Sequence, residues 1–228
     1  MTYYIGFDLD NTLYDHQQFV VGAYLDIAKK VGRLYGISVN EFYGNIFSKW
    51  QKHTSRCTHI FSDTLKEYDI YSPETEKELV SIYRNHTPSI TLYPHVRTGL
   101  KQLVKSGFTL GLLTDGQPDV QRRKIASLDI ERHFEAIVIT GDLGRNYYKP
   151  HPRGFVELAK KIKTHAAAMV YVGDNPHVDF ETPKNMGMTT IRIQTGEYKN
   201  IPHSSNLVDH NFLSTKDAII WILTQRVG

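Results

Sequence analysis

The C-terminal two-thirds of the chain alternates short apolar runs with segments whose apolar residues recur at helical spacing. The apolar runs span residues 108–113, 136–140, 168–172 and 189–193, and the helical segments span 96–106, 118–128, 153–163, 179–186 and 215–225. Alternation of this kind is typical of a parallel sheet with helices on both faces. We therefore predict an α/β fold, with the apolar run at residues 3–7 as its first strand.

Residues 14–92 break this alternation. Their apolar residues fall at helical spacing, as in the series from Phe19 to Val31, and strand-like patterns are scarce. Pro73 is one of several residues that punctuate the stretch and indicate turns between helices. We predict an all-helical inserted domain at residues 14–92, with a core domain formed by residues 1–13 and 93–228.

Composition narrows the classes of function. The chain has 228 residues, a net charge of +3 with mixed basic and acidic residues, and a single cysteine, Cys57. No basic stripe indicates a nucleic-acid partner, and no apolar run has the length of a membrane span. The first residues lack a secretory signal pattern, so we expect a cytoplasmic protein, as a monomer or weak homo-oligomer. The run Arg122-Arg123-Lys124 is interpreted as the solvated face of a helix.

Polar residues follow the predicted strands at the points where each strand ends. In chain order these residues are Asp8, Asp10, Thr114, Asp115 and Asp174, and Lys149 lies in the loop after the run at 136–140. Taken singly, each also fits a turn, a helix cap or a surface position. Because the carboxyl ends of parallel strands meet at one edge of a sheet, where ligands bind, we expect these side chains to gather in one site.

The expected site has the chemistry of phosphate transfer. One carboxylate of the Asp8 and Asp10 pair can attack an electrophile while the other handles protons. Gathered carboxylates repel one another, and Mg²⁺, with Asp8 and Asp174 as side-chain ligands, resolves that conflict. Lys149 and the cation would neutralise an incoming phosphate. Just after the run at 108–113, the hydroxyl of Thr114 and the backbone N–H groups around Asp115 and Gly116 would donate hydrogen bonds to the phosphate.

These motifs, in this order, resemble those of the haloacid dehalogenase superfamily, and specifically its phosphatases with a helical cap inserted after the first strand. The resemblance extends over essentially the whole chain. It implies a Rossmann-like core with a cap domain, and an Mg²⁺-dependent phosphomonoesterase that works through an aspartyl-phosphate. It implies that Asp8 is the nucleophile and Asp10 the general acid and base.

The resemblance also implies roles for the remaining polar residues. Thr114 would hold the phosphate, and Lys149 would steady the charge of the nucleophile and of the phosphate. Asp174 would bind Mg²⁺ directly, and the backbone carbonyl of Asp10 would complete the protein ligands. Asp179 would orient Lys149 or a metal-bound water.

Asp115 stands where asparagine is frequent in the family. It either brings an extra carboxylate near the substrate or caps the helix that begins near Pro118, and we favour the cap. The runs at residues 114–118, 141–145 and 149–152 also resemble phosphatases encoded beside bacterial surface-polysaccharide genes. That likeness points to carbohydrate metabolism and to a sugar-like or amino-alcohol phosphate as substrate.

Residues facing the site from the cap and the core loops would set specificity. Tyr14, Arg56 and Arg145 are candidates for substrate binding, and either arginine could bind a carboxylate or a second phosphate. Three alternatives to the favoured function stay open: a nucleoside monophosphate phosphatase, a phosphomutase and a non-catalytic phosphate-binding regulatory domain. A dehalogenase is disfavoured, because halide-releasing members do not keep an aspartate at the position of Asp10.

Overall fold

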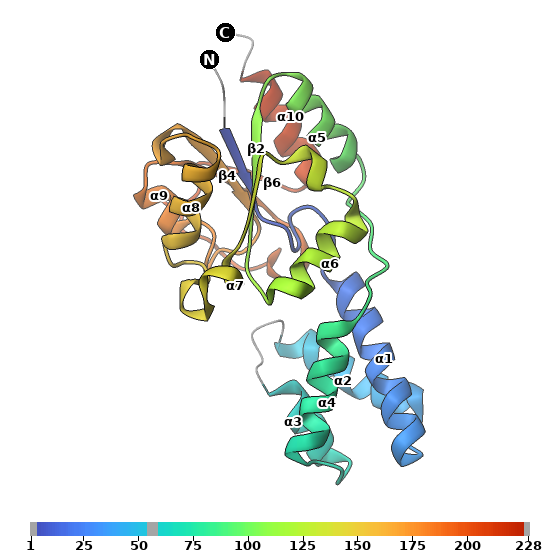
Figure 1. The fold of residues 1–228 in the computed structure, drawn as a ribbon. Coiled ribbons are helices and arrows are strands. Elements are labelled where there is room, and N and C mark those ends of the chain that lie inside the picture. The colour runs from blue at the N-terminus through green and yellow to red at the C-terminus, as the bar shows by residue number, and fades with distance from the viewer. Residues whose placement is uncertain (1–3, 54–58, 226–228) are drawn as a thin grey trace. The chain divides into compact units, whose positions relative to one another are not determined.

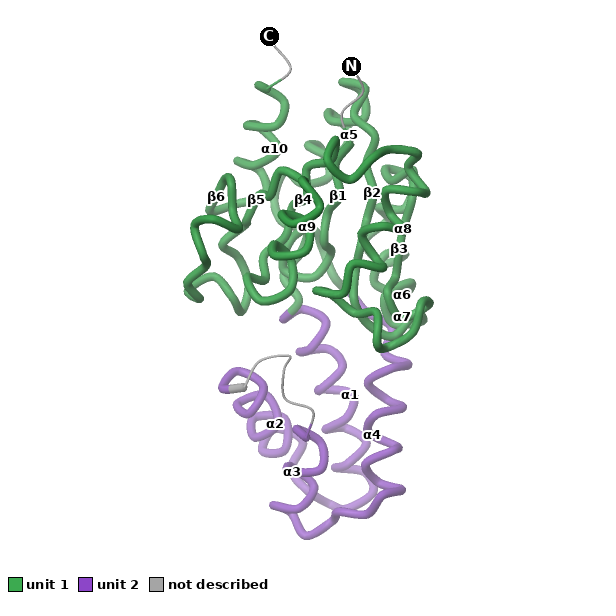
Figure 2. The backbone as a smooth tube through the Cα atoms, turned by 90° about the vertical axis from the view of Figure 1, so that its left-hand side faces the viewer, with its two compact units in different colours: residues 1–16, 90–228 green, residues 17–89 purple. Residues whose placement is uncertain are grey.

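The computed structural model describes residues 4–53 and 59–225, which belong to two compact units (Figures 1 and 2). The core unit consists of residues 1–16 and 90–228, and the helical unit consists of residues 17–89. The sequence predicts an insertion at residues 14–92. In the structure the helical unit is shorter at both ends, because residues 14–16 and 90–92 group with the core unit.

A parallel sheet of six strands forms the centre of the core unit, in the order β3-β2-β1-β4-β5-β6. The strands are β1 (Tyr4–Phe7), β2 (Thr109–Thr114), β3 (Ala136–Ile139), β4 (Met169–Gly173), β5 (Thr189–Ile193) and β6 (His210–Phe212). The predicted α/β fold with a Rossmann-like parallel sheet is confirmed. The apolar pattern does not predict β6, because this strand has three residues and none of them is buried.

Two glycines in the centre of the sheet allow a helix to approach closely. Gly6 of β1 pairs in register with Gly111 of β2. A Cβ at Gly6 would lie 3.1 Å from the side chain of Leu158, and a Cβ at Gly111 only 2.7 Å from it. Leu158 belongs to α8 (Arg153–Lys161) and is fully buried. The small residues of the apolar runs therefore fix how α8 packs on the sheet.

Helices cover both faces of this sheet (Figure 1). The helix α5 (Val96–Lys105) packs against α10 (Thr215–Thr224), and a Cβ at Gly99 would lie only 2.8 Å from Ile219. The remaining helices of the unit are α6 (Pro118–Leu128), α7 (Thr140–Leu143) and α9 (Glu181–Asn185). Single turns of 3-10 helix complete the connections, including η3 (Arg145–Tyr147) and η5 (Gly196–Tyr198).

The helical unit has its own apolar core. Its helices are α1 (Gln17–Tyr35), α2 (Val39–His53), α3 (Ile60–Glu67) and α4 (Pro73–Asn85). Tyr24, Phe42 and Leu65 are among the buried residues that pack together between these helices. The side chain of Ser72 accepts a hydrogen bond from the backbone N–H of Thr75 and so caps the start of α4. The predicted helical character of the insertion is therefore found in the described part of this unit.

None of the helices in the described part of the chain has both the length and the apolar character that a membrane crossing requires.

Candidate active site

The first strand delivers Asp8 to the carboxyl edge of the sheet. The backbone N–H of Asp8 donates to the carbonyl of Val172 at 2.9 Å, which extends the pairing of β1 with β4 by one residue. A tight turn follows, in which the N–H of Leu13 donates to the carbonyl of Leu9 at 3.0 Å. Asn11 within this turn has a φ of 60°. The turn directs the Asp8 and Asp10 side chains into different surroundings.

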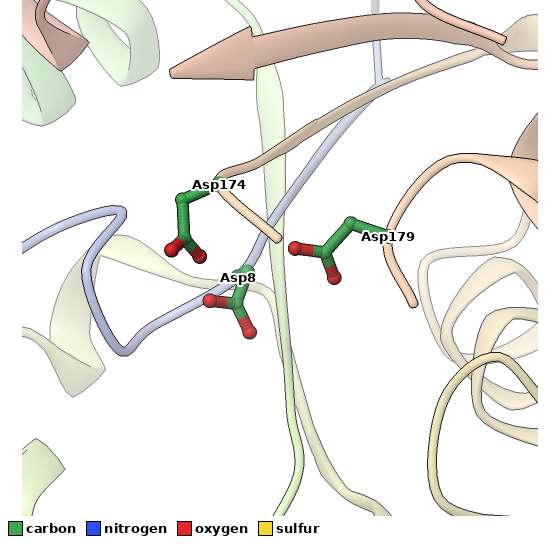
Figure 3. A group of neighbouring side chains, drawn as sticks. All are labelled: Asp8, Asp174 and Asp179. Carbon is green, nitrogen blue, oxygen red and sulfur yellow. The ribbon is translucent and has the colours of Figure 1, made fainter. Parts of the chain in front are cut away.

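Three carboxylates gather where β1 and β4 end. Asp8, Asp174 and Asp179 each offer a carboxylate oxygen, and these atoms lie within 4.8 Å of one another (Figure 3). All three side chains are buried. Gly173 makes the arrangement possible, because a Cβ there would lie 2.6 Å from a carboxylate oxygen of Asp179. The predicted neighbours Asp8, Asp174 and Asp179 are therefore brought together.

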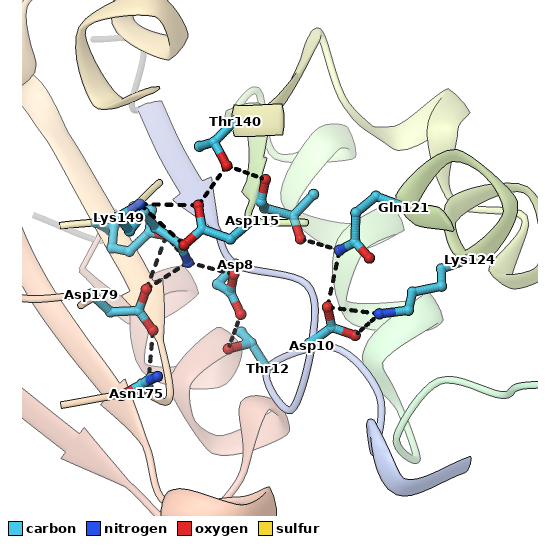
Figure 4. A network of polar contacts seen from close by, with 12 residues as sticks. Asp8, Asp10, Thr12, Asp115, Gln121, Lys124, Thr140, Lys149, Asn175 and Asp179 are labelled. Atoms are coloured by element: carbon cyan, nitrogen blue, oxygen red, sulfur yellow. Dashed lines mark hydrogen bonds and ion pairs between the residues drawn. The ribbon is translucent and has the colours of Figure 1, made fainter. Parts of the chain in front are cut away.

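Lys149 places one ammonium group among these acids. Its Nζ donates to Oδ1 of Asp8 and to Oδ1 of Asp179, both at 2.7 Å, and to the hydroxyl of Tyr171 at 3.3 Å (Figure 4). Lys149 is only 7% exposed. Burial by itself lowers the pKa of the ammonium, but Asp179 and Asp8 outweigh it and hold that pKa well above its usual value. Lys149 is therefore a fixed positive charge in contact with two of the acids.

One ammonium does not balance three buried carboxylates. Burial, partly opposed by Lys149 and reinforced by Asp179, raises the pKa of Asp8 to about 7. Burial and the neighbouring charges of Asp179 and Asp8 raise the pKa of Asp174 well above its usual value. These shifts indicate a deficit of positive charge on the Asp8 and Asp174 side of the group.

The donor set fits a hard divalent cation. Oδ2 of Asp174 is buried and has no hydrogen-bond partner within the described residues, although buried carboxylate oxygens are normally satisfied. Carboxylate oxygens are the ligands that Mg²⁺ prefers. Asp174 therefore has the unsatisfied oxygen of a Mg²⁺ ligand. Asp8 has the same chemistry beside it, with Oδ1 accepting from Lys149 and Oδ2 accepting a long hydrogen bond from the hydroxyl of Thr12 at 3.4 Å. Both oxygens of Asp179 accept hydrogen bonds at 2.7 and 2.9 Å, from Lys149 and from the N–H of Asn175.

The side chain of Asp10 has entirely different neighbours. Its two oxygens lie 2.8 and 3.0 Å from Nζ of Lys124, and Oδ2 accepts from Nε2 of Gln121 at 3.0 Å (Figure 4). Oδ1 also lies 3.0 Å from Nδ1 of His16 and accepts from the hydroxyl of Tyr14. Burial by itself raises the pKa of Asp10, but Lys124 and His16 outweigh it and hold that pKa well below its usual value.

Thr114 and Gly116 lie where β2 ends. Thr114 is 1% exposed, and its hydroxyl oxygen accepts a hydrogen bond from Nε2 of Gln121 at 2.5 Å. Gly116 has a φ of +138°, which side chains with a Cβ rarely adopt. Gln121 therefore links Thr114 to Asp10, since the same nitrogen contacts both.

The expectation that Asp115 caps the following helix is wrong. The residue before α6 is Gln117, and it makes no side-chain cap. The Asp115 carboxylate accepts instead from the hydroxyl of Thr140 at 2.7 Å and from the backbone N–H of Lys149 at 3.1 Å. Burial raises the pKa of this carboxyl. Asp115 thus ties the end of β2 to the start of α7 and to the loop that carries Lys149.

The three candidates for substrate binding lie in different places. Tyr14 is fully buried, and its hydroxyl contacts Asp10 and lies 3.3 Å from Nδ1 of His16. Arg145 begins the exposed turn η3. Arg56 lies outside the described residues. Of the two candidates that the structure describes, Tyr14 is in contact with a predicted catalytic group, Asp10.

Sequence analysis missed Lys124 and Gln121. The run at residues 122–124 was interpreted as solvated, and that is wrong for Lys124, which is 3% exposed. A signal was present in the sequence: Gln121, Lys124 and Leu128 recur at the spacing of one helical face, and all three are buried. Arg122 lies on another face of α6 and is exposed, as predicted.

The chain is similar to hydrolases of one family and to phosphatases within it. The family model of haloacid dehalogenase-like hydrolases matches residues 5–193. Glyceraldehyde 3-phosphate phosphatase from Methanocaldococcus jannaschii is 32% identical over 201 residues, which are 86% of this chain and 87% of the relative. Phosphoserine phosphatase from Thermus thermophilus is 31% identical over 148 residues, 64% of this chain and 57% of the relative.

The fold is also found among solved structures. The crystal structure of a HAD phosphatase from Thermococcus onnurineus superposes with a TM-score of 0.66 and covers 97% of this chain and 98% of its own. Its sequence is 22% identical, so the likeness concerns the fold.

Proposed function

This chain belongs to the haloacid dehalogenase-like hydrolase family, and we propose that it is an Mg²⁺-dependent phosphomonoesterase that works through an aspartyl-phosphate intermediate. The observation that carries this proposal is the contrast between Asp8 and Asp10. Asp8 contacts Lys149 and lies beside two further carboxylates that could hold a cation with it. Asp10, two residues later in the chain, is surrounded by hydrogen-bond donors such as Lys124. Two nearby carboxylates with different partners are what a nucleophile and a separate acid and base require. Without cation and substrate the pKa of Asp8 is raised and that of Asp10 is lowered, the reverse of the order that the mechanism needs. A cation bound to Asp8 would lower the first pKa, and the negative charge of a phosphate beside Asp10 would raise the second.

The first step transfers the phosphoryl group to the protein. A carboxylate oxygen of Asp8 attacks phosphorus, and the bond from phosphorus to the alcohol oxygen of the substrate breaks. Asp10 must carry a proton in this step, which requires the bound phosphate to raise the pKa that Lys124 and His16 lower in the free protein. Asp10 gives this proton to the departing oxygen, and the alcohol leaves. Lys149 holds the Asp8 side chain in place and offsets the negative charge of the phosphate.

The second step releases inorganic phosphate. Asp10 takes a proton from a water molecule as that water attacks phosphorus, and the bond from phosphorus to Asp8 breaks. Thr114 and the backbone N–H groups near Gly116 hold the phosphate oxygens in both steps. Mg²⁺, held by Asp8, Asp174 and the backbone carbonyl of Asp10, would supply further positive charge to the phosphate.

The substrate we propose is a small phosphorylated metabolite, with sugar-like and amino-alcohol phosphates favoured. Two relatives named above carry the names of phosphatases of a three-carbon sugar phosphate and of a phosphorylated amino acid, and these names support a small phosphorylated metabolite. Arg145, which is exposed, and Arg56 are proposed to contact the part of the substrate beyond the phosphate. A cytoplasmic location and a monomeric or weakly associated state complete the proposal.

Phosphate release from a panel of phosphate esters tests the proposal. The panel contains sugar, amino-alcohol and nucleoside phosphates, each assayed with Mg²⁺ and with EDTA. We expect Mg²⁺-dependent release from one compound class and loss of turnover in Asp8→Asn, with Asp63→Asn, an exposed carboxylate of α3, unchanged. Full activity in Asp8→Asn would contradict the mechanism. Phosphate retained on an isomerised product would indicate a mutase, and no turnover would indicate a binding domain.

A further inference from the structure

The buried side of α6 carries a lysine that the mechanism above does not use. Lys124 is 3% exposed, and its Nζ lies 2.8 Å from one oxygen of Asp10 and 3.0 Å from the other. A buried ammonium group is costly unless it is paired and hydrogen-bonded. The separation of 114 positions between Asp10 and Lys124 shows that the fold, and not local sequence, creates this pair.

A second residue of the same helix completes the contact. Gln121 precedes Lys124 by three positions, so both side chains project from one face of α6. Nε2 of Gln121 lies 3.0 Å from Oδ2 of Asp10 and 2.5 Å from the hydroxyl oxygen of Thr114. Through these two side chains, α6 contacts the residue proposed to move protons (Figure 4) and also the residue proposed to hold the phosphate.

We propose that Lys124 is a positioning residue, which holds the Asp10 carboxylate in the orientation required for both proton transfers, with Gln121 as its partner. The inference rests on the proposed function of Asp10. A lysine that contacts both oxygens restricts rotation of the carboxylate about its last side-chain bond. A proton transfer requires a donor and acceptor about 3 Å apart, and small displacements cost large factors in rate.

The exposed neighbour on the same helix provides a matched comparison. Arg122 pairs with Asp142 at 2.8 Å, but its side chain is 54% exposed. Exposed pairs of this kind contribute little to stability or rate. Replacing Arg122 with methionine therefore measures the effect of removing a cation from α6 without disturbing Asp10.

The first experiment compares leaving groups. An alkyl phosphate that the protein hydrolyses requires a proton from Asp10 to depart, whereas 4-nitrophenyl phosphate releases a stable phenolate without one. In single-turnover measurements, we expect Lys124→Met to slow alkyl phosphate cleavage about 10- to 100-fold and leave release of 4-nitrophenolate within about twofold. Arg122→Met should match the wild type with both substrates, and the substrate dissociation constant from the concentration dependence of the single-turnover rate should change in neither variant.

The second experiment asks whether Lys124 acts through Asp10. Steady-state hydrolysis of 4-nitrophenyl phosphate is measured for Lys124→Met, Asp10→Asn and the double variant. We expect the double variant to be no slower than Asp10→Asn alone. Thermal unfolding checks that each variant is folded, and Lys124→Gln, which keeps one donor, replaces Lys124→Met if the latter is not.

Each outcome has a distinct meaning. A wild-type rate of alkyl phosphate cleavage in Lys124→Met would overturn the inference and leave the proposed function standing. An equal loss with both leaving groups, a raised substrate dissociation constant in single-turnover measurements, or a further loss in the Asp10→Asn background would also overturn it, because Lys124 would then act on the substrate or on the fold. A wild-type protein that releases phosphate from no substrate would overturn the proposed function itself.

Discussion

Asp8 and Asp10 are two residues apart in the chain, yet the side chains packed around them differ in charge. Around Asp8 lie two further buried carboxylates, and the ammonium group that the described residues place among them, that of Lys149, contacts Asp8 and Asp179. Around Asp10, Lys124 and three further side chains with nitrogen or hydroxyl groups surround a single carboxylate; those three are Gln121, His16 and Tyr14. The pKa of Asp8 is accordingly raised, and the pKa of Asp10 is lowered.

This difference in charge shows which of the two carboxylates lies where a bound cation is required. The surroundings of Asp10 satisfy its charge with protein groups alone, so no ion is needed there. The surroundings of Asp8 leave an oxygen of Asp174 without a partner among the described residues, and a divalent cation would supply the missing charge. Under the proposed function, the same strand-to-loop connection would carry a nucleophile that depends on the cation and an acid and base whose side chain is held by protein groups.

Removing the single ammonium of the Asp8 side should have the largest effect. Lys149→Met leaves Asp8 and Asp179 buried without their shared partner. Breaking a buried ion pair in this way costs about 3–5 kcal/mol of unfolding free energy, which urea denaturation in EDTA measures. The rate of phosphate release should fall about 10²- to 10³-fold, as for other lost charge-stabilising groups.

Lys160→Met is the control for that variant, because Lys160 is an exposed lysine of α8. It should stay within about 0.5 kcal/mol of the wild type. A Lys149→Met protein as stable as this control would mean that the three acids do not need a cation, and the contrast between the two sides would disappear.

Replacing Asp174 should reduce Mg²⁺ binding without reducing the stability of the metal-free protein. At a Mg²⁺ concentration of about 100 times the dissociation constant, the wild type should gain about 2.7 kcal/mol, seen as a higher Tm. Asp174→Asn should lose most of this gain, yet in EDTA it should be no less stable than the wild type, because it removes one of three repelling acids. Asp63→Asn should keep the full Mg²⁺ response, and an unchanged response in Asp174→Asn would contradict the assignment.

The two aspartates should also have opposite effects on stability as the pH changes in EDTA. The folded-state pKa of Asp8 is about 7, above its usual value of 3.8, so the folded protein binds more protons between these values. Stability due to Asp8 therefore falls as the pH rises from about 4 to 7, by up to ~1.4 kcal/mol per pH unit. The folded-state pKa of Asp10 is below 3.8, so its contribution is present above that value and is lost as the pH falls through the folded pKa.

Urea denaturation at a series of pH values tests this contrast. Asp8→Asn should flatten the decline between about pH 4 and 7, and Asp10→Asn should flatten the loss of stability in acid and lower stability at neutral pH. Asp174 also has a raised pKa, so part of the decline should persist in Asp8→Asn. Identical profiles for the two variants would contradict the opposite surroundings.

Much of the Asp8 side could be predicted from sequence because its residues follow regular elements. Strand and helix bounds such as β5 at Thr189–Ile193 and α6 at Pro118–Leu128 match the predicted ranges. The predicted helix at 179–186 is shorter in the structure, because the N–H of Asp179 donates to the carbonyl of Asn175 in a turn before α9. Apolar runs therefore locate the strand ends, and the polar residue at each end is placed by the sheet.

The Asp10 side could not be predicted in the same way. Its cation lies on a helix within a run of three basic residues, and a charge run is usually a solvated face. Whether Lys124 is buried depends on a carboxylate 114 residues earlier in the chain, and no local pattern contains that information. Asp115 likewise finds its partners Thr140 and Lys149 through the packing of separate loops.

Tyr14→Phe should have the smallest effect, because Asp10 keeps its other partners. The phenol hydroxyl contacts Asp10, but Lys124, Gln121 and His16 remain. Loss of one hydrogen bond from a well-satisfied group costs about 1 kcal/mol. Tyr35→Phe is the control, because it removes a hydroxyl that is hydrogen-bonded to Thr75 at 3.1 Å in the helical unit. It measures the loss of unfolding free energy when a tyrosine hydroxyl outside the site is removed.

The kinetic result for this variant decides between two roles for Tyr14. The sequence predicted a substrate-binding residue, and loss of the hydroxyl would then raise KM. The structure directs the hydroxyl to Asp10, so we expect KM to be unchanged and kcat to fall less than in Lys124→Met, because a carboxylate held by three remaining groups moves less than one that has lost its cation. A raised KM would place Tyr14 on the substrate and would weaken the view that Asp10 is held entirely by its own neighbours.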